Sequence, residues 1–370
     1  AQAILGQAFQ QALAQLFRCC AAPSPAGAAT MGCGKSKYEK PKELKSVWHP
    51  KYFEGLPRME GKIVAITGCT SGTGFVCARD CARLGAMVLM LNRNSERATA
   101  ALEAVKVAAP GAKVIHIPCD LMSFAAVPEA AAKIREAVGE TGLDVLCNNA
   151  GVMASKDEAT KDGYDVQMQT NHLSHFLLTR DLWPQLTKAA ELRGEARVVN
   201  HSSLARKGKK LEQKYLGKNG GNLGGDKVGT MPCSGARWER YHQTKLANLV
   251  FTLALRDRIV TAGSKVKVMV AHPGVAATEL QVHSVSDGGM SGGVANLIVS
   301  QTAEDGALGI LMSCCDPAVQ SGGLYGPGGQ GLKGMAKLLP AAPEEKLADE
   351  ASRTLLWEAS EEATGRKFAI

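Results

Sequence analysis

The stretch Lys62-Ile-Val-Ala-Ile-Thr-Gly-Cys-Thr-Ser-Gly-Thr-Gly74 decides the fold of this 370-residue chain. Its apolar residues over 62–67 predict a buried strand, and a helical segment over 72–84 follows at once. The glycines of the connecting turn let the backbone approach a pyrophosphate, and the N–H groups at the start of the helix can bind its charge. The stretch therefore predicts the first strand, turn and helix of a dinucleotide-binding sheet.

Strand-like and helical segments continue to alternate along the chain, which is typical of a parallel sheet flanked by helices. Strands are expected over 87–91, 113–118, 143–148, 197–202, 265–271 and 323–325. Helices are expected from Asn94 or Ser95, over 164–187, around Tyr241, from a capping box at Thr302 and Asp305, and over 344–363. The sequence predicts an α/β fold, a single Rossmann-type doubly wound parallel sheet with helices on both faces.

Two segments depart from this alternation. Residues 205–236 carry many glycines and lysines without apolar periodicity, so they are expected to form an insertion before the helix around Tyr241. Loops of that length in compact domains are usually lids, binding loops or mobile excursions. Residues 1–57 lack the sheet pattern and are expected to form an N-terminal extension.

The composition restricts the class of protein. The longest apolar stretch, 246–255, is too short to cross a membrane, which takes about 20 residues. Eleven cysteines without a Cys-x-x-Cys pair argue against a disulfide framework and a structural zinc site, and Cys77 and Cys81 are expected to be small buried side chains. Part of the net charge of +8 comes from basic runs at 35–45 and 206–218, which lack the interleaved aromatics of a nucleic-acid binder. We therefore expect neither a metal nor a nucleic acid as partner.

Tyr241 and Lys245 stand four residues apart at the start of an apolar helical run, so their side chains share one face of the helix. The pKa of a tyrosine phenol in water is about 10, and a neighbouring ammonium lowers it by stabilising the phenolate. Lys245 is therefore expected to lower the pKa of Tyr241. Such a tyrosine can act as general acid or base on an alcohol or carbonyl oxygen.

The strand over 87–91 is followed by a segment that bears on the cofactor, Leu91-Asn-Arg-Asn94. An NAD-selective site offers a carboxylate here to the ribose 2′-hydroxyl. Asn92 is neutral instead, and Arg93 can pair with a 2′-phosphate. The sequence therefore favours NADP(H) over NAD(H).

Together these motifs resemble the short-chain dehydrogenase/reductase family. Thr67 to Gly74, Asn148-Asn-Ala-Gly151, the pair of Tyr241 and Lys245, and Pro273-Gly274 occur in the family's order, each at its expected place. Four further segments are similar to the retinol dehydrogenase-like branch of the family. These segments are Asn171-His-Leu-Ser-His-Phe176, Val198-Val-Asn-His-Ser-Ser203, Tyr241 to Phe251 and Trp357-Glu-Ala-Ser360. The resemblance covers residues 58–367 and implies one NADP(H)-binding domain over that range.

The resemblance also implies roles for single residues. Tyr241 matches the family's acid/base, Lys245 its activator, and Asn171 the residue that keeps a water in line with the lysine. Ser203 matches the residue that hydrogen-bonds the reacting oxygen of the substrate, with Ser202 as the competing choice. The implied cofactor-binding residues are Gly68, Thr70, Ser71, Gly72, Thr73, Gly74, Arg93, Asp120, Leu121, Asn149, Ala150, Gly151, Tyr241, Lys245, Pro273, Gly274 and Thr278. Histidines near these motifs are expected to be structural, namely His172, His175, His201, His242 and His272.

The function that the resemblance implies is NADP(H)-dependent hydride transfer to or from the carbonyl or alcohol carbon of an apolar substrate, such as a retinoid, a steroid or a lipid aldehyde. A light-dependent protochlorophyllide reductase shares much of the pattern, although the Asn148-Asn-Ala-Gly151 motif and the C-terminal ending argue against it. A non-catalytic NADPH-sensing or docking protein is the alternative from another class. Family members often dimerise through the two helices that here carry Asn171 and Tyr241, so a homodimer is a further expectation.

The N-terminus carries a candidate lipid anchor. Met31-Gly-Cys-Gly-Lys-Ser36 matches the N-myristoylation pattern at Gly32, with Cys33 open to palmitoylation and the following lysines to anionic lipid. The pattern functions only if Met31 initiates translation, and residues 1–30 would also suit a transit peptide. The protein is therefore expected to be cytoplasmic or peripheral on a membrane, with import into an organelle as the other option.

Overall fold

The computed structural model describes residues 44–370 except 230–232, 293–299, 330 and 341–342. The chain divides into two compact units, Ala1–Lys35 and Ser36–Ile370, and everything below concerns the described residues of the second unit. The predictions on the lipid anchor and the transit peptide lie outside the described residues. Within them, no helix is long and apolar enough to cross a membrane.

One eight-stranded sheet forms the centre of the fold, in the order β3-β2-β1-β4-β5-β6-β7-β8. The strands are β1 (Ile63–Thr67), β2 (Met87–Asn92), β3 (Val114–Pro118), β4 (Val145–Asn148), β5 (Ala196–His201), β6 (Val266–Ala271), β7 (Leu324–Gly329) and β8 (Lys333–Leu338). The first seven run parallel, and β8 pairs antiparallel with β7. The order through β6 is that of doubly wound dinucleotide-binding sheets, so the predicted fold class and its seven strands are confirmed. The sequence did not indicate β8, in which Ala336 is the one buried residue.

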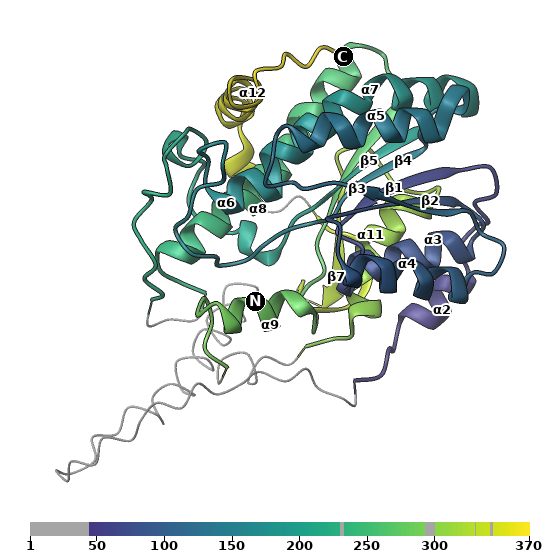
Figure 1. Cartoon of the computed structure of the whole chain (residues 1–370), viewed down its shortest axis with the longest axis horizontal. Coiled ribbons are helices and arrows are strands. Elements are labelled where there is room, and N and C mark those ends of the chain that lie inside the picture. Colours follow the sequence, from purple (N-terminus) through teal and green to yellow (C-terminus); the bar gives the residue numbers. More distant parts are fainter. Residues whose placement is uncertain (1–43, 230–232, 293–299, 330, 341–342) are drawn as a thin grey trace, which may run out of the picture. The chain divides into compact units, whose positions relative to one another are not determined.

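Helices cover both faces of this sheet. They are α2 (His49–Glu54), α3 (Gly72–Arg83), α4 (Glu96–Ala108), α5 (Ala126–Val138), α6 (Val166–Met168), α7 (Ser174–Arg193), α8 (Ala236–Thr261), α9 (Glu279–Ser286), α11 (Ala303–Cys315) and α12 (Glu350–Thr364). Figure 1 shows α5, α7, α8 and α12 on one face of the sheet and α2, α3, α4 and α11 on the other. Each face has its own apolar core, because strands buried on both sides must be covered twice.

The segment before β1 belongs to this unit. The Asp305 carboxylate, at the start of α11, accepts hydrogen bonds from the backbone N–H groups of Val47, Trp48 and His49 at 2.9 to 3.0 Å. His49 in turn lies 2.6 Å from the Asp80 carboxylate on α3. The compact unit therefore begins well before residue 58, where the sequence analysis places the domain boundary.

Two predicted helices have different ends in the structure. The helix expected over 164–187 begins at Val166, where the Asp165 side chain caps α6, and passes through a π-helical turn at Gln169–Leu173 before α7. It ends at Gly194, whose φ of 87° suits a C-cap glycine. The predicted caps at Ser95 and Thr302 are confirmed, because their hydroxyls accept hydrogen bonds from Ala98 N and Asp305 N.

Candidate active site

Tyr241 and Lys245 lie on the first turns of α8, with their side chains on the same face of the helix as predicted. Both are buried, at 3% and 4% exposure, and Lys245 Nζ stands 5.7 Å from the centre of the Tyr241 ring. Ser203 lies near enough to the Tyr241 hydroxyl to lower its pKa, and Lys245 Nζ donates to the His201 carbonyl at 3.1 Å. The phenol, the ammonium and the serine hydroxyl therefore meet at the carboxyl end of β5.

The pKa values of this pair differ from the prediction. Burial raises the pKa of Tyr241 well above its ordinary value, and the neighbouring Ser203 offsets only part of that rise. Burial also lowers the pKa of Lys245 to about 8. When only the groups of the polypeptide act on Tyr241, the prediction of a lowered pKa is therefore wrong. Desolvation of the phenolate outweighs an ammonium that is itself partly desolvated and lies beside the ring.

Asn171 lies in the π-helical turn that precedes α7. Its side chain forms two hydrogen bonds with the backbone of Val152, from Nδ2 to the carbonyl at 2.9 Å and from Val152 N to Oδ1 at 2.8 Å. Gly151 leaves room for both Asn171 and Lys245, because a Cβ there would lie 3.1 Å from Asn171 Oδ1 and 3.3 Å from Lys245 Nζ. The extra residue of a π turn is a common way to redirect a side chain toward a functional site.

The two candidate serines face different partners. The Ser202 hydroxyl is buried and donates to the Lys245 carbonyl at 2.7 Å, which ties the end of β5 to α8. Ser203 is only half-buried, and it is the serine that interacts with Tyr241 and lowers the pKa of its phenol. The geometry thus favours Ser203 for contact with a substrate oxygen, in line with the preference from sequence.

The glycine turn between β1 and α3 packs tightly on the Asn148-Asn-Ala-Gly151 segment. Asn149 Nδ2 donates to the carbonyls of Thr67 and Gly68 at 2.8 and 3.1 Å. A Cβ at Gly74 would lie 2.2 Å from Asn149 Nδ2 and 2.3 Å from the Gly68 carbonyl oxygen, and Gly68 itself has a φ of 72°. Neither glycine can therefore be replaced without moving the turn, which holds the first N–H groups of α3 at the sheet edge where dinucleotides bind.

The end of β2 provides polar groups beside this turn. Asn92 Oδ1 accepts from Cys69 N at 2.7 Å, while its buried Nδ2 has no hydrogen-bond partner among the described residues. Arg93 is exposed. Arg97, on the first turn of α4, reaches within 3.5 Å of the Ser71 hydroxyl, the N-cap of α3. Arg97 was not predicted from the sequence, although an arginine one helical turn beyond Arg93 can bind the same phosphate.

The remaining predicted cofactor residues line the same edge. Thr278, after β6, lies 3.4 Å from where a Cβ of Gly72 would stand, so the β6 loop reaches the start of α3. Asp120 Oδ1 accepts from Met122 N at 3.0 Å and so shapes the turn after β3. The structure thus gathers the loops after β1, β2, β3, β4 and β6 along one edge, which is where the sequence places Thr70, Ser71, Thr73, Leu121, Ala150, Pro273 and Gly274. The donors and the glycine turn suit a dinucleotide that carries phosphates.

A small apolar cluster surrounds Tyr241. It consists of Ala154, Trp238, Tyr241 and Met290, with Met153, Ala205, Val228, Val282 and Val285 packed against it. Trp238 stands edge-on to Tyr241 at 5.7 Å between ring centres, and its indole N–H donates to the Gly289 carbonyl at 2.9 Å. The walls come from the loop after β4, from the insertion and from residues in the range 275–299, which includes α9. Residues 293–299 of that range lie outside the described residues.

Two buried arginines on the first turn of α8 fix these walls. Arg237 donates to the carbonyls of Asp226 and Asp287 at 3.0 and 2.8 Å and so joins the insertion to the end of α9. Arg240, fully buried, donates to Ser155 and Gly225 carbonyls and lies 3.2 Å from the Asp165 carboxylate. The helix that carries Tyr241 therefore also holds the segments around it.

Three histidines and three cysteines around the site are buried in the core. Burial lowers the pKa of His172 and of His201 to about 3, and that of His175 to about 4. Cys77, Cys147 and Cys314 bring their Sγ atoms within 4.8 Å of one another from α3, β4 and α11. Their distance along the chain hid this group from the sequence analysis, and all three pack in the apolar core on that face.

Several known proteins resemble this chain in sequence or in fold. A model of the short chain dehydrogenase family matches residues 62–215. An uncharacterized oxidoreductase of Schizosaccharomyces pombe is 35% identical over 248 residues, which cover 66% of this chain and 69% of that protein. Human retinol dehydrogenase 13 is 36% identical over 224 residues, which cover 60% of this chain and only 62% of that protein. A crystal structure of an uncharacterized protein from Mycobacterium Paratuberculosis superposes with a TM-score of 0.66 at 31% identity, covering 86% of this chain and 98% of that one.

Proposed function

Because the chain belongs to the short-chain dehydrogenase/reductase family, in its retinol dehydrogenase-like branch, we propose that it interconverts carbonyl and alcohol groups of an apolar substrate with NADP(H). Membership of this family makes the chain an NAD(P)-dependent oxidoreductase acting on CH–OH or C=O groups. The observation that carries the proposal is the placement of Tyr241 beside Lys245 and Ser203, inside an apolar cluster. Retinoids, steroids and lipid aldehydes are the substrate class that such walls favour.

In the proposed reaction the bound nicotinamide supplies or accepts the hydride. Ser203 and Tyr241 hydrogen-bond the substrate oxygen, and Tyr241 donates its proton to the oxygen as negative charge develops there. The raised pKa of Tyr241 keeps the phenol protonated at neutral pH, which suits the donor in carbonyl reduction. Lys245 and Asn171, next to each other at Gly151, return a proton to Tyr241 through a water. Oxidation of the alcohol runs through the same groups in reverse.

The preference for NADP(H) is supported by charge at the end of β2. No carboxylate follows β2 directly, since the chain continues with Asn92 and Arg93. Arg97 adds a second guanidinium beside Ser71 at the start of α3. A guanidinium forms strong charge-assisted hydrogen bonds with a phosphate, so both arginines are proposed to bind the 2′-phosphate of the adenosine ribose.

Replacing Arg93 and Arg97 together with Ala is expected to raise the KM for NADPH about tenfold or more, because hydrogen bonds to a charged group are worth about 1.5–3 kcal/mol each. The KM for NADH should stay within about twofold, since NADH lacks the 2′-phosphate. Initial rates at varied cofactor concentration measure both constants. Equal loss for NADH and NADPH would contradict the assignment of these arginines to the 2′-phosphate.

The proposed activity is tested by NADPH oxidation against a panel of aldehydes and ketones. All-trans-retinal, a steroid ketone and medium-chain aldehydes represent the apolar class, and small polar aldehydes serve as the contrast. We expect turnover with at least one apolar carbonyl and much weaker turnover with the polar ones. NADPH binding without any turnover would instead support the sensing or docking alternative, and light-dependent reduction of protochlorophyllide would support the third candidate.

Two expectations about partners remain proposals. Peripheral membrane contact is proposed through the N-terminus, on the pattern from Met31 to Ser36. A homodimer through α7 and α8 would have to avoid α12, because Trp357 of α12 packs against Phe176 and Phe251 of those helices at 5.2 and 6.1 Å between ring centres. Such a dimer is proposed only for the parts of the two helices that α12 leaves uncovered.

A further inference from the structure

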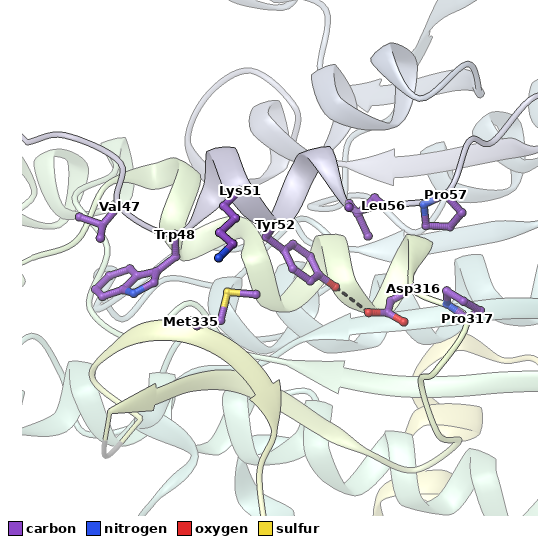
Figure 2. A pocket seen from close by; sticks show the side chains of 10 residues that line it. Val47, Trp48, Lys51, Tyr52, Leu56, Pro57, Asp316, Pro317 and Met335 are labelled. Carbon is purple, nitrogen blue, oxygen red and sulfur yellow. Dashed lines mark hydrogen bonds between the residues drawn. The ribbon is translucent and has the colours of Figure 1, made fainter.

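A cavity of about 700 Å³ lies away from Tyr241, between α2, the end of α11 and the edge strand β8. Figure 2 shows Trp48, the N-cap of α2, and Tyr52 of α2 facing Met335 of β8 across it, with Lys51 beside them. The Tyr52 hydroxyl donates to the Asp316 carboxylate at 2.9 Å, which closes one side. This groove contains none of the predicted catalytic residues, so its apolar lining needs another explanation.

Two exposed apolar side chains, Val47 and Met335, line this groove. Seven large apolar residues are exposed in the described part of the chain, and four of them belong to the segment before α2 and to β8. They are Leu44, Val47, Met335 and Leu338, at 37%, 66%, 36% and 42% exposure. Single exposed apolar residues are ordinary, but a concentration beside an apolar groove indicates an interaction surface.

The same two segments carry exposed lysines, Lys45, Lys51, Lys333 and Lys337. None of the four forms an ion pair among the described residues. The neighbouring Asp316 carboxylate accepts a hydrogen bond from the Tyr52 hydroxyl instead. The basic run in the insertion differs, because Lys209, Lys210 and Lys214 pair with Glu239, Asp349 and Glu212. Uncompensated positive charge is therefore found at the groove rather than on the longer basic run.

We propose that the surface around this groove, here called the α2–β8 face, docks on an anionic lipid bilayer. Val47, Lys51 and Met335 line the groove, and Lys333 and Lys337 alternate onto the same side of β8 as Met335. Lysines around an exposed apolar patch match such a membrane, since the apolar groups enter the interface and the ammonium groups meet the headgroups. The chain also continues from Leu44 into a further basic stretch with Lys35, Lys37, Lys40 and Lys42.

A second copy of the chain fits this face less well. Two β8 edges brought together would place Lys333 and Lys337 of both copies near each other, and lysines on an edge strand are a known obstacle to strand pairing. An anionic surface removes this repulsion. The proposal concerns a binding partner and does not depend on hydride transfer.

The test is co-sedimentation of the full chain with phosphatidylcholine vesicles, with and without phosphatidylserine. The wild type is expected to bind the anionic vesicles, and less so as salt is added. The double variant Lys333→Glu with Lys337→Glu should lower the partition coefficient at least about twentyfold, since each lysine near an anionic surface strengthens binding about fivefold. The matched control, Lys209→Glu with Lys214→Glu, should bind like the wild type.

An apolar pair completes the design. Val47→Asn should weaken vesicle binding several-fold, while Val107→Asn, at an exposed valine on α4, should not. Turnover in solution should be unchanged in all four variants. Equal binding of wild type and the Lys333 and Lys337 variant would overturn the proposal, as would equal binding to neutral vesicles. A wild-type dimer that this variant converts to a monomer in light scattering would assign the face to a second copy instead.

Discussion

Tyr241→Phe is expected to lower kcat for carbonyl reduction by about 10²–10⁴-fold, the usual contribution of a positioned general acid. Phe keeps the ring that packs against Trp238 and loses only the hydroxyl near Ser203. NADPH affinity should change little, because the phosphate and adenosine contacts lie on the loops after β1 and β2. Steady-state kinetics with the best aldehyde and a fluorescence titration with NADPH measure the two quantities.

The matched control for this experiment is Tyr215→Phe. Tyr215 is also buried, at 4% exposure, but it lies in the insertion and packs into the main core. This variant removes the same atom from a tyrosine away from the cluster around Tyr241, so it should keep kcat within about twofold of the wild type. Wild-type turnover in Tyr241→Phe would refute the acid/base role, and a parallel loss in Tyr215→Phe would point to folding instead.

Acidification from pH 7 to pH 5 is expected to cost about 6 kcal/mol of folding free energy through three buried histidines. His172, His175 and His201 have folded-state pKa values of about 3, 4 and 3. The unfolded chain takes up their protons below about pH 6.5, whereas the folded chain does not until pH falls to about 4. Each histidine therefore lowers the free energy of unfolding by about 2 kcal/mol at pH 5. Stability falls as the pH decreases from about 6.5 to about 4.

Denaturant unfolding at pH 7 and pH 5 measures this loss, which is comparable with the whole stability of many domains, about 5–15 kcal/mol. His172→Gln should reduce the pH effect by about 2 kcal/mol, whatever it does to stability at pH 7. His283→Gln is the control, because His283 is exposed. A pH effect of the same size in the His172 variant would show that other groups cause the acid sensitivity.

Elements with strong local signals were predictable. The seven parallel strands are apolar runs that must be buried on both faces, and caps such as Ser95 and Thr302 depend on a few neighbouring residues. The spacing of Tyr241 and Lys245 also fixes a shared helix face by geometry alone. Segments with weak signals were missed, namely α5 with its many alanines, α2, and β8 with one buried residue.

The sequence by itself determined the seven parallel strands, the glycine turn and the shared helix face of Tyr241 and Lys245, because each of these follows from periodicity or spacing within a short segment. The other candidate residues came from the resemblance to a known family. Only the tertiary structure decided which serine faces Tyr241, which arginine joins Arg93 near the turn, and which segments wall the apolar cluster. It also reversed the expected pKa shift of Tyr241, since burial is set by distant segments packed around a side chain. Desolvation and contacts between elements depend on the whole fold, and no local pattern of residues encodes them.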